Sequence, residues 1–263
     1  MGDATTFDLR RYVRGQAQSN AVWLALMALI AFGLLRYDNF GGAYNIVSFL
    51  NYNSMFIVIS IGMCFVIMTG GIDLSVGSVA AFTSVVAAYL SPWGIEVALP
   101  GGILAGIAFG AVNAFVIILM RVPPFIATLA TMLAAKGGAL VLSGAQTISV
   151  DWGSNFTKLG MEKAFGVVPW TIVLVAIVAL AAWFVLERTS LGRTVLAIGG
   201  GEDASVLMGL EVDRTKAFVY MLSGACAGIA GVFWPPASGQ ASRSKGWAGS
   251  SRPSRPSSSA ARS

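Results

Sequence analysis

The sequence offers few side chains that could carry out chemistry. It contains no histidine, so it has no His-ligated metal site, no Ser-His or Cys-His nucleophile pair and no histidine general base. Its two cysteines, Cys64 and Cys226, each lie inside an apolar run, which favours small buried hydrophobes over disulfide partners or metal ligands. We therefore expect a chain without a catalytic site, a metal or a bound cofactor of its own.

One short segment, residues 69–78, joins two long apolar runs through glycines, hydroxyls and a carboxylate. Glycine lets a chain turn or approach another backbone closely, and Asp73 or Ser75 can cap the helix that resumes toward Ala80. Because acids inside a membrane are functional suspects, two interpretations stay open: a buried structural turn with a cap, or a stretch that contacts a solute. The candidate residues are Gly70, Gly71, Asp73, Ser75, Gly77 and Ser78.

Two further polar residues, Asn113 and Lys136, lie inside otherwise apolar runs. Either could face a solute path, and each also has a structural interpretation. Lys136 precedes Ser143 by seven residues, about two helical turns, so its amine could reach the membrane surface.

Glycines recur at four-residue spacing in two of the apolar runs. Such spacing places small residues on one face of a helix, where two helices can pack closely and gain dispersion contacts in lipid. This pattern predicts close helix packing in an assembled bundle, either within the chain or at a dimer seam. The residues are Gly102, Gly106 and Gly110 in one run and Gly224 and Gly228 in the other.

The elements that must position these residues are membrane helices. Hydrophobic residues make up 56% of the 263 residues, while 17 Lys and Arg and 12 Asp and Glu give about half the charged fraction of an ordinary soluble domain. A membrane span needs roughly 20 apolar residues. Seven stretches approach this length: residues 21–35, 47–70, 76–90, 103–120, 125–142, 167–186 and 217–234. We expect an all-α, polytopic membrane helix bundle with about seven transmembrane helices.

The distribution of basic residues predicts the orientation of the bundle. If the N-terminus is cytoplasmic, eight basic residues of the N-terminal segment and the loops lie on the cytoplasmic side of the membrane and three lie on the outer side. This distribution agrees with the positive-inside bias. Residues 1–19 then form a cytoplasmic segment and residues 20–234 the transmembrane domain. Residues 187–216 form a substantial cytoplasmic loop within that domain.

The last segment, residues 235–263, differs abruptly from the rest. It contains ten serines, four prolines, four arginines and one lysine, and it has no acid and no Leu, Ile, Val, Met or Phe. Such a low-complexity segment cannot bury a core, so we expect either a disordered tail or the product of a shifted reading frame. Its five basic residues account for the whole formal charge of +5, which leaves no basic surface for nucleic acid on the bundle.

Four stretches resemble one family. Residues 63–78 read MCFVIMTGGIDLSVGS, and residues 121–142, 189–210 and 212–231 follow in a matching order and spacing. They are similar to the membrane-spanning permeases of bacterial ABC importers for monosaccharides of the ribose, xylose and galactose type. The resemblance covers about residues 45–233, and full-length members of that family continue through further membrane helices, so the chain looks truncated or frame-shifted after about Phe233.

The resemblance implies a role for the cytoplasmic loop. In the family this loop carries a short coupling helix, expected here at residues 202–210, that docks on the ATPase subunit. The residues that match the family's pattern are Gly192, Arg193, Ala197, Gly199, Gly200, Ala204 and Gly209, and Glu202 and Asp203 are further candidate residues of the coupling loop. The resemblance further implies an inner-membrane, multi-pass subunit that carries a monosaccharide from a periplasmic binding protein, beside a second permease copy in the lipid. The ATPase subunit, rather than this chain, would bind ATP and Mg.

Two other functions stay open. A secondary transporter or channel would place ionisable groups at the middle of the membrane for ion coupling, and only Asp73 and Lys136 are candidates. A truncated permease fragment without transport activity is the second alternative.

Overall fold

The computed structural model describes residues 9–146, 148, 150, 155–156, 163–164 and 168–237. It divides into two units, the first ending at Phe49 and the second beginning at Leu50. Helices make up nearly all of the described chain, so the prediction of an all-α bundle is confirmed.

The first unit is built around α1 (Leu9–Arg36), a helix of 28 residues. Its polar N-terminal half leaves only Trp23–Arg36 as an apolar stretch, which is shorter than a full membrane span. Within this stretch large apolar side chains such as Leu24, Leu29 and Leu35 are exposed. The first predicted span, residues 21–35, is therefore apolar as expected, but its apolar stretch is shorter than the six candidate spans of the other helices.

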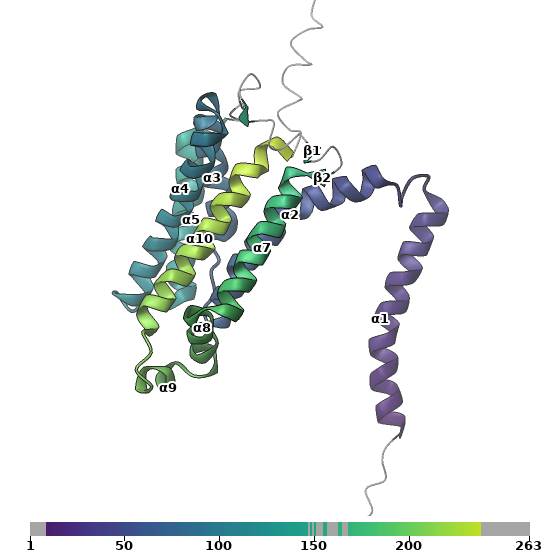
Figure 1. Cartoon of the computed structure of the whole chain (residues 1–263), viewed down its shortest axis with the longest axis horizontal. Helices are drawn as coiled ribbons and strands as arrows, with labels where there is room; N and C mark the ends of the chain where they lie inside the picture. The colour runs from purple at the N-terminus through teal and green to yellow at the C-terminus, as the bar shows by residue number, and fades with distance from the viewer. Residues whose placement is uncertain are drawn as a thin grey trace, which may run out of the picture. The chain divides into compact units, whose positions relative to one another are not determined.

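The second unit holds the remaining helices (Figure 1). Helix α2 begins in the first unit and continues into the second. The elements are α2 (Ala43–Met68), α3 (Val76–Leu90), a 3-10 turn (Ser91–Trp93), α4 (Ile95–Ile118), α5 (Pro124–Ser143), α7 (Trp170–Arg188), α8 (Ser190–Gly200), α9 (Glu202–Leu207) and α10 (Val212–Ala237). Strands β1 (Lys163–Ala164) and β2 (Val168–Pro169) form a two-residue antiparallel pair.

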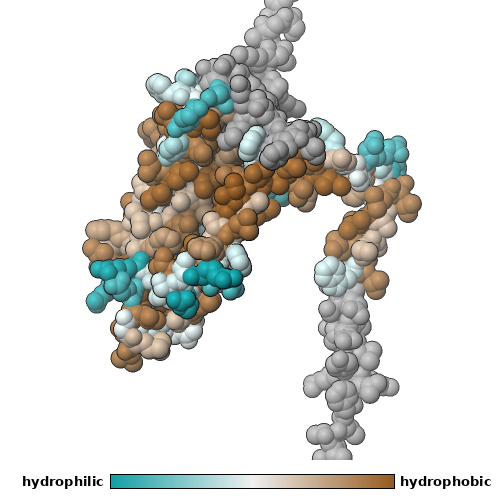
Figure 2. All heavy atoms as spheres, viewed as in Figure 1, coloured by the Kyte–Doolittle hydropathy of each residue, from teal (hydrophilic) through white to brown (hydrophobic). Residues whose placement is uncertain are grey.

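Six of the described helices are long and apolar enough to cross a membrane: α2, α3 with its 3-10 turn, α4, α5, α7 and α10. Their surface supports this function, because large apolar side chains such as Leu104, Leu133 and Leu180 lie exposed on it. Figure 2 shows hydrophobic residues over most of the visible face of this unit, with hydrophilic residues gathered near its ends. Water would not stabilise such a surface, whereas lipid chains would.

The interior of the second unit contains many small side chains beside a few large ones such as Phe65 and Tyr220. Alanines of α3, α4, α5 and α10 are buried, together with hydroxyl residues whose oxygens bond to backbone carbonyls of their own helices. Helix α10 is the most enclosed span, because it packs on both α4 and α3. In its most apolar stretch, 61% of the residues are buried. Helix α7 is the least enclosed span, with 6% of the residues in its most apolar stretch buried, although Ala182, Val185 and Leu186 pack partly against the core.

Some predicted details differ from the structure. Cys226 is buried as expected, but Cys64 is exposed on α2, because its side of that helix faces away from the neighbouring helices. Helix α4 begins at Ile95 rather than at residue 103, since Pro100 is accommodated inside the helix instead of preceding it. Helix α10 continues to Ala237, and the rest of the predicted tail, residues 238–263, lies outside the described residues.

Candidate functional site

The turn between α2 and α3 is shaped by glycine and by a hydroxyl. The backbone N–H groups of Thr69 and Gly71 and the Thr69 hydroxyl all donate to the carbonyl of Val66, which ends α2. Gly70 follows with a φ of +74°, a left-handed conformation that glycine adopts without steric cost. The chain thereby leaves α2 and runs into the segment that contains Asp73.

Asp73 closes the turn that leads into α3. Its Oδ1 accepts hydrogen bonds from the backbone N–H of Ser75 at 2.9 Å and from the Ser75 hydroxyl at 2.6 Å. The side chain of Ser75 makes no cap hydrogen bond to the helix itself. Neither of the two residues that the sequence offered as caps accepts a hydrogen bond from an N–H of α3; Asp73 instead accepts from the N–H of Ser75, the residue just before the helix.

Two further helices contribute to this site. The Ser223 hydroxyl of α10 donates to Asp73 Oδ2 at 2.9 Å, and the Asn113 amide of α4 donates to the Ser75 hydroxyl oxygen at 3.0 Å. We call Asp73, Ser75, Asn113, Tyr220 and Ser223 the polar cluster; each is exposed by 2% or less. Three donors thus satisfy a buried carboxylate, and hydrogen bonds to a charged group are the strong ones.

Tyr220 of α10 completes the polar cluster without a hydrogen bond. A Cβ placed on Gly71 would lie 2.6 Å from the Tyr220 hydroxyl oxygen, so the missing side chain at Gly71 is what admits the phenol. Among the described residues, neither the Tyr220 hydroxyl nor Asn113 Oδ1 has a partner, although both are buried. Such groups are uncommon in folded proteins and call for an explanation.

The structure brings Gly71, Asp73, Ser75 and Asn113 together in and beside a buried turn. It leaves the other predicted members of this set elsewhere. Gly70, Gly77 and Ser78 take no part in the described hydrogen bonds of the polar cluster. Lys136 lies exposed on α5. Sequence reasoning missed Tyr220 and Ser223; the available signal was two polar residues three positions apart in an apolar run, on one face of a helix.

The predicted glycines meet in one contact between α4 and α10. A Cβ on Gly106 would lie 2.1 Å from the carbonyl oxygen of Gly224, and one on Gly228 would lie 2.6 Å from that of Gly102. Gly110 is as close to the backbone of Tyr220, at 2.4 Å. This contact lies within the chain, and it fixes the two helices that carry Asn113 and Ser223.

The loop after α7 is held against the bundle by two glycines. Thr189 starts α8 by accepting the N–H of Gly192, and a Cβ at that glycine would lie 2.0 Å from the carbonyl oxygen of Leu186. A Cβ on Gly199 would lie 2.1 Å from the carbonyl oxygen of Met68, the last residue of α2. The end of α8 therefore touches the end of α2, just before the turn that leads to Asp73.

Helix α9 lies within the expected coupling segment and spans Glu202–Leu207. Gly209, with a φ of +78°, turns the chain after it. Glu202 Oε1 pairs with Lys216 Nζ at 2.5 Å, which connects α9 to the first turns of α10. The tip of the loop presents Val206, Leu207 and Met208, and Leu207 is 88% exposed.

The other predicted loop residues differ in their surroundings. Asp203, Ala204 and Arg193 are exposed, and a Cβ on Gly200 would meet no atom within 4 Å. A charged crevice of about 410 Å³ opens beside α9. Arg121, Glu202, Asp213 and Lys216 provide its charged lining.

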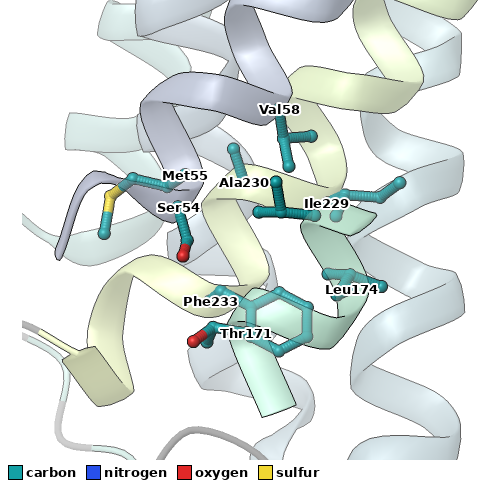
Figure 3. Close-up of a pocket in the computed structure, with 9 residues that line it drawn as sticks. Ser54, Met55, Val58, Thr171, Leu174, Ile229, Ala230 and Phe233 are labelled. Carbon is teal, nitrogen blue, oxygen red and sulfur yellow. The ribbon is translucent and has the colours of Figure 1, made fainter. Parts of the chain in front are cut away.

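A small cavity lies between α2, α7 and α10 (Figure 3). Its lining is mostly apolar: Ser54, Met55, Val58, Thr171, Leu174, Val175, Ile229, Ala230 and Phe233. Beside it, the Thr171 hydroxyl bonds to Asn51. The cavity volume of about 10 Å³ admits roughly one water and no monosaccharide.

Long apolar spans around a polar and glycine-lined interior define a polytopic membrane protein. The family of permease components described as "Branched-chain amino acid transport system / permease component" matches residues 45–248. The chain belongs to this family and is accordingly a membrane-spanning transport component.

Several curated proteins are similar to the chain over most of its length. The ribose import permease protein RbsC of Escherichia coli (strain K12) is 36% identical over 239 residues, which cover 88% of this chain and 74% of that protein. The D-allose transport system permease protein AlsC of the same strain is 34% identical over 212 residues, covering 80% and 64%. The fructose import permease protein FruG of Bifidobacterium longum (strain NCC 2705) is 32% identical over 204 residues, covering 72% and 59%. No solved structure matches the chain.

Proposed function

We propose that the chain is the translocating subunit of an ABC importer for a monosaccharide in a bacterial inner membrane. The observation that carries this proposal is the agreement between the permease family match and relatives named for ribose, allose and fructose. The family description mentions amino acids, but these relatives are named for sugars, so we assign a sugar. The absence of histidine agrees with a subunit that moves a solute without changing its bonds.

The loop containing α8 and α9 is the proposed contact with an ATPase subunit that binds ATP and Mg. Its exposed apolar tip at Val206, Leu207 and Met208 supports this assignment, because apolar side chains on an aqueous loop gain free energy when a partner covers them. The acids of the first turn of α9 provide charge beside that tip. A periplasmic sugar-binding protein would deliver the solute on the opposite side, and the N-terminus would be cytoplasmic.

A second permease copy is part of the proposed assembly. The outward faces of α7 and α5 support it, since the small internal cavity cannot pass a sugar and a path must form elsewhere. Lys136 is exposed on α5, and a charge in the middle of a span is costly where only lipid surrounds it. Covering it with a second subunit or with the water of a path removes this cost.

Uptake of radiolabelled ribose tests the proposal. The chain is reconstituted in vesicles with an ATPase subunit and a sugar-binding protein from the same genome, and ribose, allose and fructose are compared. We expect uptake that requires ATP on the ATPase side and that survives ionophores which dissipate proton and sodium gradients. Uptake that collapses with the ion gradient would identify a secondary transporter or channel. Absence of uptake from a correctly assembled complex would identify an inactive fragment.

A further inference from the structure

Two contacts lead from the cytoplasmic loop to the polar cluster. Gly199 of α8 lies against Met68, one residue before the turn that carries Asp73. Glu202 of α9 pairs with Lys216, one helical turn before Tyr220 on α10. A displacement of the loop is therefore passed to both partners of the polar cluster, the turn at residues 69–75 and α10.

We propose that the polar cluster is a two-position latch between the turn at residues 69–75 and α10. In the arrangement described, Ser223 donates a hydrogen bond to Asp73, and the Tyr220 hydroxyl has no hydrogen-bond partner among the described residues. In the other arrangement, Tyr220 donates to Asp73 and Ser223 is released. This inference rests on the proposed function, which requires the permease to alternate between two arrangements.

The idle hydroxyl of Tyr220 is the first argument for a second position. A buried polar group without a partner costs free energy, so its presence needs a compensating role. Tyr220 and Ser223 are three residues apart on α10, which places them on the same face and about 4.5 Å apart along the axis. The Tyr220 hydroxyl already touches the turn at Gly71, two residues from Asp73. A small shift of the turn along α10 exchanges one hydroxyl for the other.

The turn has the freedom that such a shift needs. Gly70 lies within the turn and Gly77 in the first turn of α3, and a Cβ at either position would meet no atom within 4 Å. Both are exposed, and the backbone can rotate at Gly70, which lies outside the helices, without displacing a packed side chain at that position. Asn113 adds to the argument, because its idle Oδ1 can accept a hydroxyl donor that the shift brings within reach.

The latch predicts effects of opposite sign for two hydroxyl deletions. Ser223→Ala removes a hydrogen bond that exists only in the described arrangement, and a bond to a carboxylate is worth roughly a tenfold or larger change in the ratio of the two arrangements. Tyr220→Phe removes a hydroxyl that is idle here, so it favours the described arrangement. A rigid staple would respond to the first substitution and ignore the second.

The reporter is a cysteine at Ile72, beside Asp73 and 47% exposed, in a chain whose exposed Cys64 is replaced by alanine. The rate of alkylation by N-ethylmaleimide is measured with the full chain in membranes. We expect Ser223→Ala and Tyr220→Phe to shift this rate in opposite directions, and Ser223→Thr, which keeps the hydroxyl, to retain the parent rate. Ser60→Ala is the matched control, because that hydroxyl donates to the carbonyl of Phe56 in its own helix and, among the described residues, takes no part in the polar cluster.

Equal shifts in one direction, or no response to Tyr220→Phe, would overturn the latch. Each variant's thermal unfolding midpoint is recorded, and the alkylation rates are compared at a temperature below the midpoint of every variant, so that a difference in rate reports the arrangement of a folded chain. A second arm adds the ATPase subunit and a non-hydrolysable ATP analogue, which should move the parent rate toward the Ser223→Ala value. Opposite shifts without a nucleotide response would support the latch and contradict the proposed ATPase partnership.

Discussion

Replacing Gly106 by alanine should destabilise the bundle far more than a single methyl group would suggest. The new Cβ would lie 2.1 Å from the carbonyl oxygen of Gly224 and 3.0 Å from the α carbon of Gly228, whereas ordinary contact begins at 3.4 Å. All of these atoms belong to the backbone of α10, so no side chain can rotate away. The two helices must therefore separate by about 1 Å along their contact.

The cost of that separation can be estimated. A radial gap of 0.5–1 Å forfeits roughly a quarter to a half of each dispersion contact across the seam, and overpacking typically costs about 1–3 kcal/mol. The better helix propensity of alanine returns only about 1 kcal/mol. We expect a net loss of about 2 kcal/mol, and a fall in Tm of about 4–8 °C for a chain of this size.

The measurement is the thermal unfolding of the purified permease in detergent, followed by its retention in size-exclusion chromatography. Gly137→Ala on α5 is the matched control, because it makes the same chemical change in a helix where a Cβ would meet no atom within 4 Å. This control should melt at the parent temperature or slightly above it. A Gly106→Ala protein that melts within a degree of the Gly137→Ala protein would refute the close backbone seam.

Three further perturbations separate the roles of the site and the loop. Asp73→Ala leaves the N–H and hydroxyl of Ser75 and the hydroxyl of Ser223 without their acceptor. The free energy of unfolding should therefore fall by about 3 kcal/mol in a thermal assay. The control Asp203→Ala, at an exposed position, should change it by less than about 0.5 kcal/mol. Gly199→Ala should push α8 from α2 and reduce sugar uptake per ATP hydrolysed, whereas neighbouring Gly200→Ala, where a Cβ has open space, should reduce that ratio much less. Leu207→Asp on the exposed tip should keep the Tm and weaken co-purification with the ATPase subunit by about tenfold or more.

The spans were predictable because lipid imposes a length and a composition on every helix that crosses it. The six long helices fall where apolar runs occur, and Pro124 begins α5 where a missing N–H is harmless. The start of α4 was misplaced because the predicted span was bounded by its uninterrupted apolar run from residue 103, whereas the helix begins at Ile95 and continues through Pro100. Boundaries of this kind depend on tertiary packing, which a local pattern does not contain.

The site was predictable only in part, for a related reason. Glycine spacing indicated which faces of α4 and α10 allow close approach, but a pattern on one helix does not name its partner, so packing within the chain and packing between copies stayed equivalent. Asp73 was recognisable as an acid in an apolar context. Its burial against Ser223 and Asn113 depends on helices far away in the sequence, and single hydroxyls in membrane spans are too common to indicate that contact.

The distribution of polarity also explains how one bundle can be both stable and mobile. Its helices α4 and α10 are held by close backbone contacts at glycines, which leave no room for a side chain. Its turn at residues 69–75 is held by hydrogen bonds that can change their partners. The α4 and α10 seam therefore behaves as a rigid body, and Asp73 marks a place where movement costs only a change of partner. Since the loop contacts α2 directly and α10 through Lys216, force applied at α9 reaches that place without distorting the seam.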